Sequence, residues 1–114
     1  MASQIHQGGC HCGAVRFRAR LDLAQPVVVC NCSICRKNGA MLSMVSAADF
    51  TLESGEAALS TYRFNRKVIA HRFCSTCGVQ GFSAVGDGVA VNVRVLDDAD
   101  LSGLTTMPFD GVSA

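Results

Sequence analysis

The chain contains seven cysteines, and all of them fall in three short clusters. The clusters are Cys10 and Cys12, then Cys30, Cys32 and Cys35, then Cys74 and Cys77. Such spacings bring sulfur atoms to one point, which suits a tetrahedral zinc ion with metal–sulfur bonds of about 2.3 Å. Seven sulfurs divide as four plus three. A zinc ion with three protein ligands keeps one coordination position free for chemistry.

Spacing alone does not say which clusters share a metal ion. One division joins Cys10 and Cys12 to Cys74 and Cys77 and leaves the middle cluster as a local group of three. The alternative takes two sulfurs from the middle cluster and leaves one without a site. We favour the first division because each group is complete and because the four-sulfur site would close a long loop, which restricts the unfolded chain most.

Three other uses of the cysteines are possible. A disulfide framework requires an oxidising compartment and favours an even count, and the start MASQIHQGG lacks the apolar and basic regions of a signal peptide. Buried apolar cysteines would not gather in clusters. Redox chemistry at one C-x-x-C pair stays open as an alternative.

Length and charge restrict the class of protein. The 114 residues fit one domain, 1–114, and 49% of them are hydrophobic. The formal charge of +1 is unlike the strongly basic balance of nucleic-acid-binding domains. No apolar run approaches the roughly 18 residues that span a bilayer. We therefore expect a cytoplasmic protein with no nucleic-acid or membrane partner.

The hydrophobic pattern is mostly that of strands. In Ala14–Leu21, apolar residues alternate with Arg16, Arg18 and Arg20, which is typical of a half-buried strand with a solvated outer face. Asn65-Arg66-Lys67 and Gly86-Asp87-Gly88 predict hairpin turns. Further strands are expected at Val27–Val29, Gly39–Val45, Phe50–Leu52, Leu59–Phe64, Val68–Phe73, Val79–Val85 and Val89–Val95.

No segment has a sustained helical period, so the sequence predicts an all-β domain. Asp97–Leu104 is expected to form one short helical turn, and the tail Thr105–Ala114, which has no period, to be loose at its end. The cysteine clusters fall at strand ends. Cys-Ser-Ile-Cys and Cys-Ser-Thr-Cys-Gly both predict tight zinc-ribbon turns, with Gly78 free to adopt a positive φ.

The cluster motifs, in their order, resemble one known family. Gly9-Cys10-His11-Cys12-Gly13, Cys30-Asn31-Cys32-Ser33-Ile34-Cys35-Arg36-Lys37 and Phe73-Cys74-Ser75-Thr76-Cys77-Gly78 are similar to the motifs of the glutathione-dependent formaldehyde-activating (S-hydroxymethylglutathione synthase-like) family. The resemblance covers about residues 8–95, and the chain looks like a short member.

The resemblance implies a fold, two metal sites and a reaction. The fold would be an Mss4-like β-tent of layered antiparallel sheets. Cys10, Cys12, Cys74 and Cys77 would bind a structural zinc ion, and Cys30, Cys32 and Cys35 a catalytic one that is lost more readily. The activity would be that of a carbon–sulfur lyase that acts on an adduct of glutathione, or a similar small thiol, with formaldehyde or another small aldehyde.

Three thiolates give such a catalytic site a net charge of −1, so its zinc should be a weak Lewis acid that still accepts a fourth sulfur. We expect a substrate thiol to fill the open position and add to an aldehyde carbonyl. Arg36 and Lys37 follow the cluster directly and are candidate contacts for the carboxylates of glutathione. The candidate proton donors are Ser33, Asn38 and His71.

Other functions compete with this hypothesis. A non-enzymatic zinc module that binds protein would complete the middle site from within the chain, with His71 or His11. A methionine sulfoxide reductase-like enzyme would need a reactive cysteine outside the clusters, which the chain lacks. Nucleic-acid binding would rest only on Arg16, Arg18 and Arg20.

Overall fold

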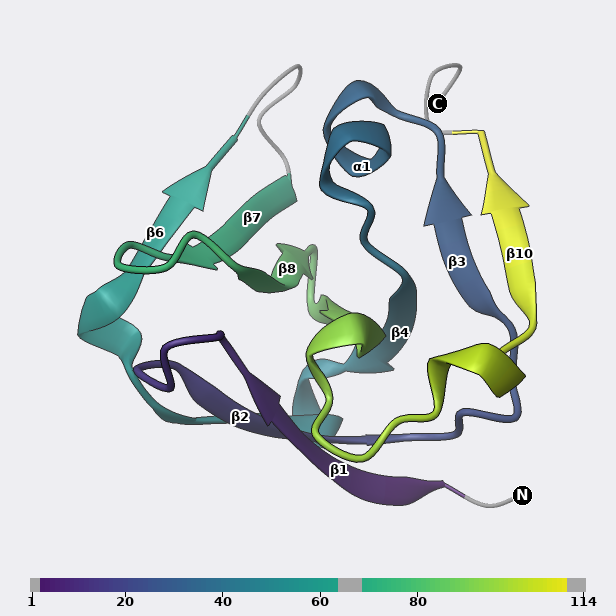
Figure 1. The fold of residues 1–114 in the computed structure, drawn as a ribbon, viewed down its shortest axis with the longest axis horizontal. Coiled ribbons are helices and arrows are strands. Elements are labelled where there is room, and N and C mark those ends of the chain that lie inside the picture. Colours follow the sequence, from purple (N-terminus) through teal and green to yellow (C-terminus); the bar gives the residue numbers. More distant parts are fainter. Residues whose placement is uncertain (1–2, 64–68, 111–114) are drawn as a thin grey trace.

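Two β-sheets dominate the computed structural model, which describes residues 3–63 and 69–110 (Figure 1). The smaller sheet has the strand order β1-β2-β5, and the larger one the order β10-β3-β4-β9-β8-β7-β6. The expected all-β, Mss4-like architecture of layered sheets is confirmed. None of the helices found in the described ranges is long and apolar enough to cross a membrane.

The smaller sheet consists of β1 (Gln4–Gly9), β2 (Arg16–Leu21) and β5 (Phe50–Ser54), all antiparallel. Strand β2 alternates as predicted, with Phe17, Ala19 and Leu21 buried and Arg18 and Arg20 exposed. Strand β1 was not predicted because its polar sequence QIHQGG does not alternate cleanly. It forms because its backbone pairs with β2 over its whole length.

The larger sheet is antiparallel except at one edge, where β10 runs parallel to β3. Its turn at Gly86, with φ 59°, joins β8 to β9 as the sequence predicted. The turn expected at Asn65-Arg66-Lys67 lies outside the described residues. The strands of this sheet are β3 (Val27–Cys30), β4 (Leu42–Ser46), β6 (Leu59–Tyr62), β7 (Ile69–Cys74), β8 (Gln80–Val85), β9 (Gly88–Asn92) and β10 (Thr106–Phe109).

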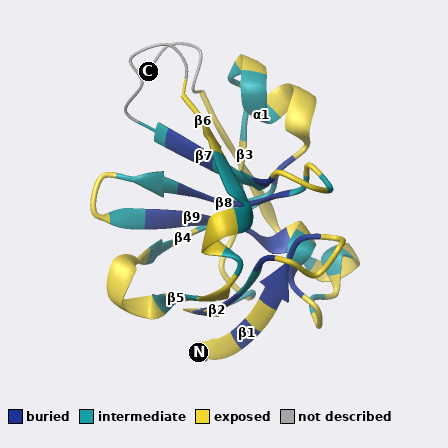
Figure 2. Cartoon of the chain, turned by 90° about the vertical axis from the view of Figure 1, so that its left-hand side faces the viewer, coloured by how far each residue is buried: buried dark blue, intermediate teal, exposed yellow. Residues whose placement is uncertain are grey.

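Aromatic side chains from both sheets meet in the core. Phe17 of β2 packs on Phe50 of β5 with ring centroids 5.2 Å apart, and both rings contact Phe82 of β8, at 6.0 and 4.6 Å. Buried valines of β9 complete this core, which lies between the sheets (Figure 2). Since each aromatic pair adds about 0.5–1.5 kcal/mol beyond burial, these contacts fix the two sheets against each other.

A short helix is the main departure from the predicted elements. Helix α1 (Ser33–Asn38) follows Cys32 directly, where the sequence predicted a zinc-ribbon turn and then a strand from Gly39. Gly39 instead ends the helix with φ 74°, a left-handed conformation that glycine adopts at no steric cost. Six residues are too few to show a helical period, so only this C-terminal glycine could have indicated the helix.

The C-terminal tail is also more ordered than predicted. Thr106–Phe109 forms β10, and its backbone pairs with Val27–Cys30 of β3. The extreme end, residues 111–114, lies outside the described residues. A 3-10 turn at Leu101–Gly103 (η4) confirms the helical turn predicted within Asp97–Leu104. Val93–Val95, predicted as the end of a strand, forms a second 3-10 turn (η3).

Candidate metal centres and the adjoining cleft

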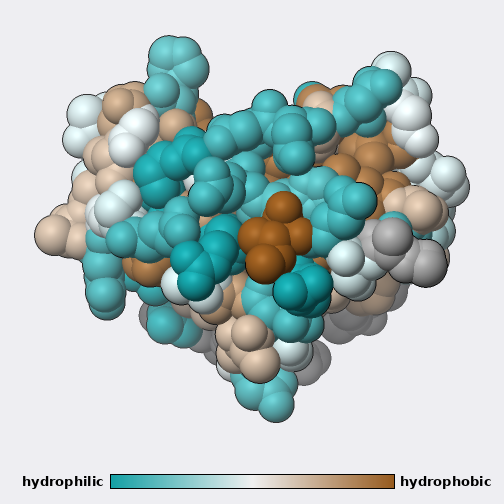
Figure 3. Space-filling model, turned by 90° about the horizontal axis from the view of Figure 1, so that it is seen from below, coloured by the Kyte–Doolittle hydropathy of each residue, from teal (hydrophilic) through white to brown (hydrophobic). Residues whose placement is uncertain are grey.

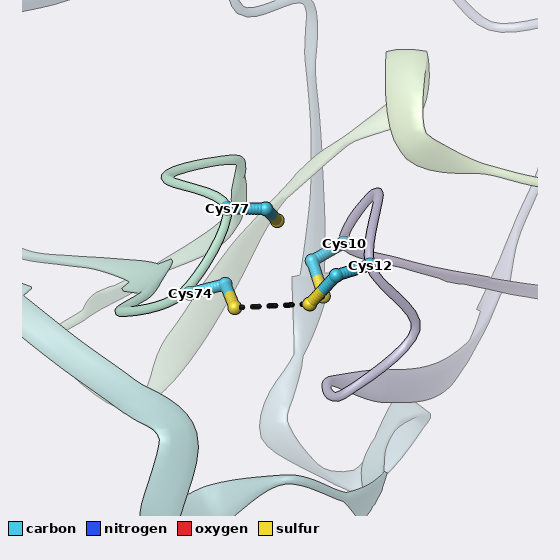
Figure 4. A group of neighbouring side chains, drawn as sticks. All are labelled: Cys10, Cys12, Cys74 and Cys77. Carbon is cyan, nitrogen blue, oxygen red and sulfur yellow. Dashed lines mark hydrogen bonds between the residues drawn. The ribbon is translucent and has the colours of Figure 1, made fainter.

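The first candidate metal centre is the four-cysteine group of Cys10, Cys12, Cys74 and Cys77. Cys10 and Cys12 lie in the turn after β1, whereas Cys74 ends β7 and Cys77 closes the turn that follows (Figure 4). Their sulfur atoms all lie within 4.8 Å of one another. Strand pairing in two different sheets therefore brings together the four residues that the favoured division predicted.

The sulfur spacing fits a metal centre better than a disulfide. Cys12 Sγ lies 3.6 Å from both Cys10 Sγ and Cys74 Sγ. A tetrahedron with bonds of about 2.3 Å places its sulfurs about 3.8 Å apart, whereas a disulfide requires about 2.05 Å. All seven cysteines of the chain are free thiols. The geometry therefore suits a zinc-like ion, and the ion's identity stays a prediction.

Backbone amides support charge on these sulfurs. Val15 N donates to Cys10 Sγ at 3.3 Å, and Thr76 N donates to Cys74 Sγ at the same distance. A hydrogen bond from the Val79 amide is the main cause that lowers the pKa of Cys77 to about 6. The amide of Cys77 likewise lowers the pKa of Cys74. Backbone hydrogen bonds thus favour the charged form of both Cys74 and Cys77.

The thiol of Cys12 has a raised pKa beside its neighbours. The Ala14 amide alone would lower the pKa of Cys12, but hydrogen bonds with the thiols of Cys10 and Cys74 outweigh it and raise the pKa to about 11. Like charges this close cannot all form without a counter-charge. Full ionisation of the group therefore requires a bound cation, which is the behaviour expected of a metal centre.

The second candidate metal centre is the three-cysteine group of Cys30, Cys32 and Cys35. Cys30 ends β3, Cys32 caps the N-terminus of α1, and Cys35 lies within α1. Their sulfurs also lie within 4.8 Å of one another. Cys32 N donates to Cys30 Sγ at 3.5 Å. Burial, reinforced by the thiol of Cys32, raises the pKa of Cys35 to about 12. This thiol too needs a cation nearby in order to ionise.

Within residues 3–63 and 69–110, the three-cysteine group has no fourth His, Cys, Asp or Glu ligand. Among the residues that the structure describes, no histidine, aspartate or glutamate completes either cysteine group. His71 is buried in the larger sheet, and His11 is exposed in the turn between Cys10 and Cys12. A metal ion bound by Cys30, Cys32 and Cys35 would therefore keep a position for an outside ligand.

A cleft of about 490 Å³ adjoins the three-cysteine group. Cys30, Cys35 and Arg36 line it, whereas Lys37 is exposed on α1 and is not among the lining residues. The other lining residues are Val29, Asn31, Gly39, Ala40, Met41, Arg94 and Pro108. The volume is within the range of small-ligand sites, roughly 300–1,000 Å³. The cleft could therefore hold a small molecule next to two of the three sulfurs.

A chain of polar side chains connects α1 to the buried part of the larger sheet. Asn38, the last residue of α1, donates a hydrogen bond to Gln80 Oε1, and Gln80 Nε2 donates to Ser83 Oγ at 2.8 Å. Ser83 Oγ lies 3.3 Å from His71 Nδ1. Gln80, Ser83 and His71 are all buried. None of the predicted proton donors, Ser33, Asn38 and His71, lines the cleft.

The arginines of β2 have local partners. Arg16 is paired with Asp97, and Arg18 Nη1 lies 2.7 Å from Glu53 Oε2. The face that carries β1 and β2 is largely hydrophilic, with a small hydrophobic patch (Figure 3). Two of the three arginine charges are thus balanced by carboxylates, which favours the solvated-face interpretation over a nucleic-acid surface.

Comparison with known proteins identifies the family. The model of the family "Glutathione-dependent formaldehyde-activating enzyme" matches residues 5–106. The chain belongs to this family. A "Putative glutathione-dependent formaldehyde-activating enzyme" of Halomonas elongata is 35% identical over 79 residues, which are 62% of this chain and 50% of the relative. The chain thus aligns with about half the length of that relative.

A solved structure has a similar fold. A crystal structure of a Rhodobacter sphaeroides protein superimposes with a TM-score of 0.78 at 30% identity, and the match covers 90% of this chain and 97% of that one. Almost the whole of that protein therefore shares the fold of this chain. Sequence reasoning missed Arg94, which is remote from the cysteine motifs in sequence. It also missed Gln80, which follows Cys77 by three residues but carries an amide that is not a usual metal ligand.

Proposed function

We propose that this protein is a zinc-dependent carbon–sulfur lyase that forms or cleaves the adduct of glutathione, or a similar small thiol, with formaldehyde or another small aldehyde. The observation that carries the proposal is the incomplete three-cysteine group beside a cleft. Family membership supports the choice of substrates. A protein whose metals serve only its own folding has no use for an open site that faces a cleft.

The two cysteine groups would have different roles. Cys10, Cys12, Cys74 and Cys77 would hold a structural zinc ion, since four sulfurs complete a tetrahedron. Cys30, Cys32 and Cys35 would hold the second ion. When bound there, zinc would supply one open position and keep the sulfur of a substrate thiol deprotonated and nucleophilic. The protein contributes by holding three cysteine sulfurs close together, with Cys30 and Cys35 at the wall of the cleft.

The reaction forms one bond and moves one proton. The thiol sulfur adds to the aldehyde carbon, the carbon–oxygen π bond breaks, and the thiol proton passes to the alkoxide oxygen. Cleavage of the adduct is the reverse. Arg36 would bind a carboxylate of the thiol substrate. Since no predicted donor side chain lines the cleft, we assign the proton transfer to solvent water.

Metal stoichiometry and thiol titration test the proposal together. Simultaneous replacement of Cys30, Cys32 and Cys35 by serine should reduce two metal ions per chain to one with the fold intact. Glutathione should perturb the visible spectrum of the cobalt-substituted protein, and the protein should accelerate adduct formation or cleavage, followed by NMR. X-ray absorption showing four protein ligands at both ions would contradict the proposal and favour the protein-binding module.

A further inference from the structure

Two positively charged side chains line the cleft beside the three-cysteine group. Arg36 and Arg94 both line it, and none of its lining residues is an aspartate or glutamate. Neither arginine belongs to an ion pair among the described residues, where the pairs found are His6–Asp98, Arg16–Asp97 and Arg18–Glu53. Arg16 and Arg18 of β2 are thus balanced by carboxylates, whereas Arg36 and Arg94 have no carboxylate partner among the described residues.

Arg94 is held in place by its backbone and by one edge of its guanidinium group. Its Nε donates to the carbonyl of Gly39 at 2.9 Å, and its backbone N donates to Asn92 Oδ1 at 3.2 Å. Asn92 is itself buried and donates to the Gln80 carbonyl at 2.9 Å. In the described part of the chain, the terminal amino groups Nη1 and Nη2 form no hydrogen bond. A fixed guanidinium edge of this kind is suited to bidentate binding of a carboxylate.

We propose that the cleft selects thiols that carry a carboxylate, and that Arg94 determines this specificity by binding the carboxylate together with Arg36. The inference rests on the proposed function, which places the thiol sulfur at the three-cysteine group. It adds the residue that would determine the preference for a carboxylate, Arg94, which lies 59 positions beyond Cys35 in the chain. Cys30 and Cys35 line the same cleft as both arginines, so one small molecule can contact a sulfur site and a guanidinium group.

Two thiols of equal length and different charge test this inference. The probes are 3-mercaptopropionate and 3-mercaptopropionamide, and their dissociation constants are measured by titration of the cobalt-substituted protein. The wild-type protein should bind the carboxylate on the order of tenfold more tightly, a typical effect of charge-assisted hydrogen bonds in a partly exposed site. This comparison requires no variant.

Variants then assign the preference to Arg94. Arg94→Gln should abolish the preference for the carboxylate thiol by weakening its binding, while the amide thiol binds within about twofold of its affinity for the wild type. Arg94→Lys should retain part of this preference through its charge. Arg20→Gln, which removes an exposed arginine of β2, should leave the preference unchanged. Metal content of two ions per chain in each variant verifies that the sites are intact.

The possible failures are distinct. If neither thiol perturbs the cobalt spectrum, the proposed function falls, and this inference with it. If both thiols bind the wild type equally, the specificity is refuted while thiol binding at the three-cysteine group stands. If the preference persists in Arg94→Gln, the carboxylate is bound elsewhere and the role of Arg94 is refuted.

Discussion

His71 of β7 is buried, and its burial makes protonation of the imidazole unfavourable. Burial lowers its pKa from the ordinary value of 6.5, because the charged form loses hydration. The folded state therefore binds its proton less readily than the unfolded state. The stability that the neutral ring contributes is complete above pH 6.5 and is lost as the pH falls from there toward the lowered folded-state pKa.

The lowered pKa of His71 predicts that the folded protein loses stability in mild acid. Between pH 7.5 and 5.5, the free energy of unfolding of the metal-loaded protein should fall, and it should fall less in His71→Gln. Within the pH interval between the two pKa values, the wild type loses up to about 1.4 kcal/mol per pH unit from this group. Urea denaturation at both pH values measures the difference, with metal content checked at each. Equal pH dependence of the two proteins would contradict the assignment.

Two glycines near the four-cysteine group differ in the space around them. Gly55 has φ 91°, and a Cβ atom there would lie 2.1 Å from the backbone oxygen of Ala14. Gly78 has φ 80° with nothing within 4 Å. Position 78 therefore requires glycine only for its left-handed conformation, whereas position 55 also requires glycine because the backbone of Ala14 lies so close.

We expect Gly55→Ala to be the more destabilising of the two changes. Gly78→Ala should cost about 1–2 kcal/mol, the usual penalty of the left-handed conformation. Gly55→Ala should cost several kcal/mol in total, because the backbone near Cys12 must also move. Urea denaturation of the metal-loaded variants measures both costs. If the two variants were equally stable, the close approach at Gly55 would be unimportant.

At the scale of elements, α1 is attached to the larger sheet at its last residue. The helix carries Cys35, and Asn38 connects it to Gln80 of β8. No residue of the helix is buried. With so little packing of its own, the helix depends for its position on this hydrogen bond and on the one that Arg94 Nε donates to the carbonyl of Gly39, at the end of the helix. The bond from Asn38 therefore helps to fix the spacing of the three-cysteine group.

Removal of this bond should weaken metal binding at one site only. Asn38→Ala should cost about 0.5–1.5 kcal/mol of stability and lower the metal affinity of the three-cysteine group, while the four-cysteine group keeps its ion. Competition with a chromophoric chelator measures the two affinities. Gln25→Ala, an exposed change outside both groups, is the control. Equal loss from both groups would show that Asn38 has only a general effect on stability.

Sequence patterns predicted strands that carry a local signal, such as alternating apolar and polar residues or a glycine turn. They missed strands that form only because a neighbouring strand pairs with them. The alternation of β2 and the glycine turn between β8 and β9 are local signals, and both predictions were right. Strands β1 and β10 form because a neighbouring strand supplies their hydrogen bonds, which no local pattern records. Among the residues that line the cleft, Arg36 could be predicted because it follows Cys35 directly. Arg94 could not, because only the folded chain brings it next to the three-cysteine group.

At the scale of the whole molecule, the four-cysteine group lies at the junction of the two sheets. Cys10 and Cys74 of this group form a small second core with Val15, against which Cys77 packs. Metal binding to such groups in small domains contributes roughly 10–16 kcal/mol, much of it coupled to folding. Removal of the four-cysteine ion leaves four crowded thiols at that junction.

Chelation should therefore unfold the protein or loosen it severely. Circular dichroism and thermal melting before and after verified removal of all metal measure the effect. The Cys30, Cys32 and Cys35 triple serine variant, which retains the four-cysteine group, should keep a cooperative melt until its remaining ion is removed. Unchanged spectra and melting in metal-free wild-type protein would refute the prediction.

The separation of ligands along the chain would also set the order in which the two proposed ions bind during synthesis. Cys30, Cys32 and Cys35 leave the ribosome almost together, whereas Cys77 follows Cys35 by 42 residues. At about 5–20 residues per second, that interval lasts roughly 2–8 seconds. The nascent chain would therefore carry all three ligands of one group before the four-cysteine group is complete. Under zinc limitation, the three-cysteine group would be the first to bind an ion.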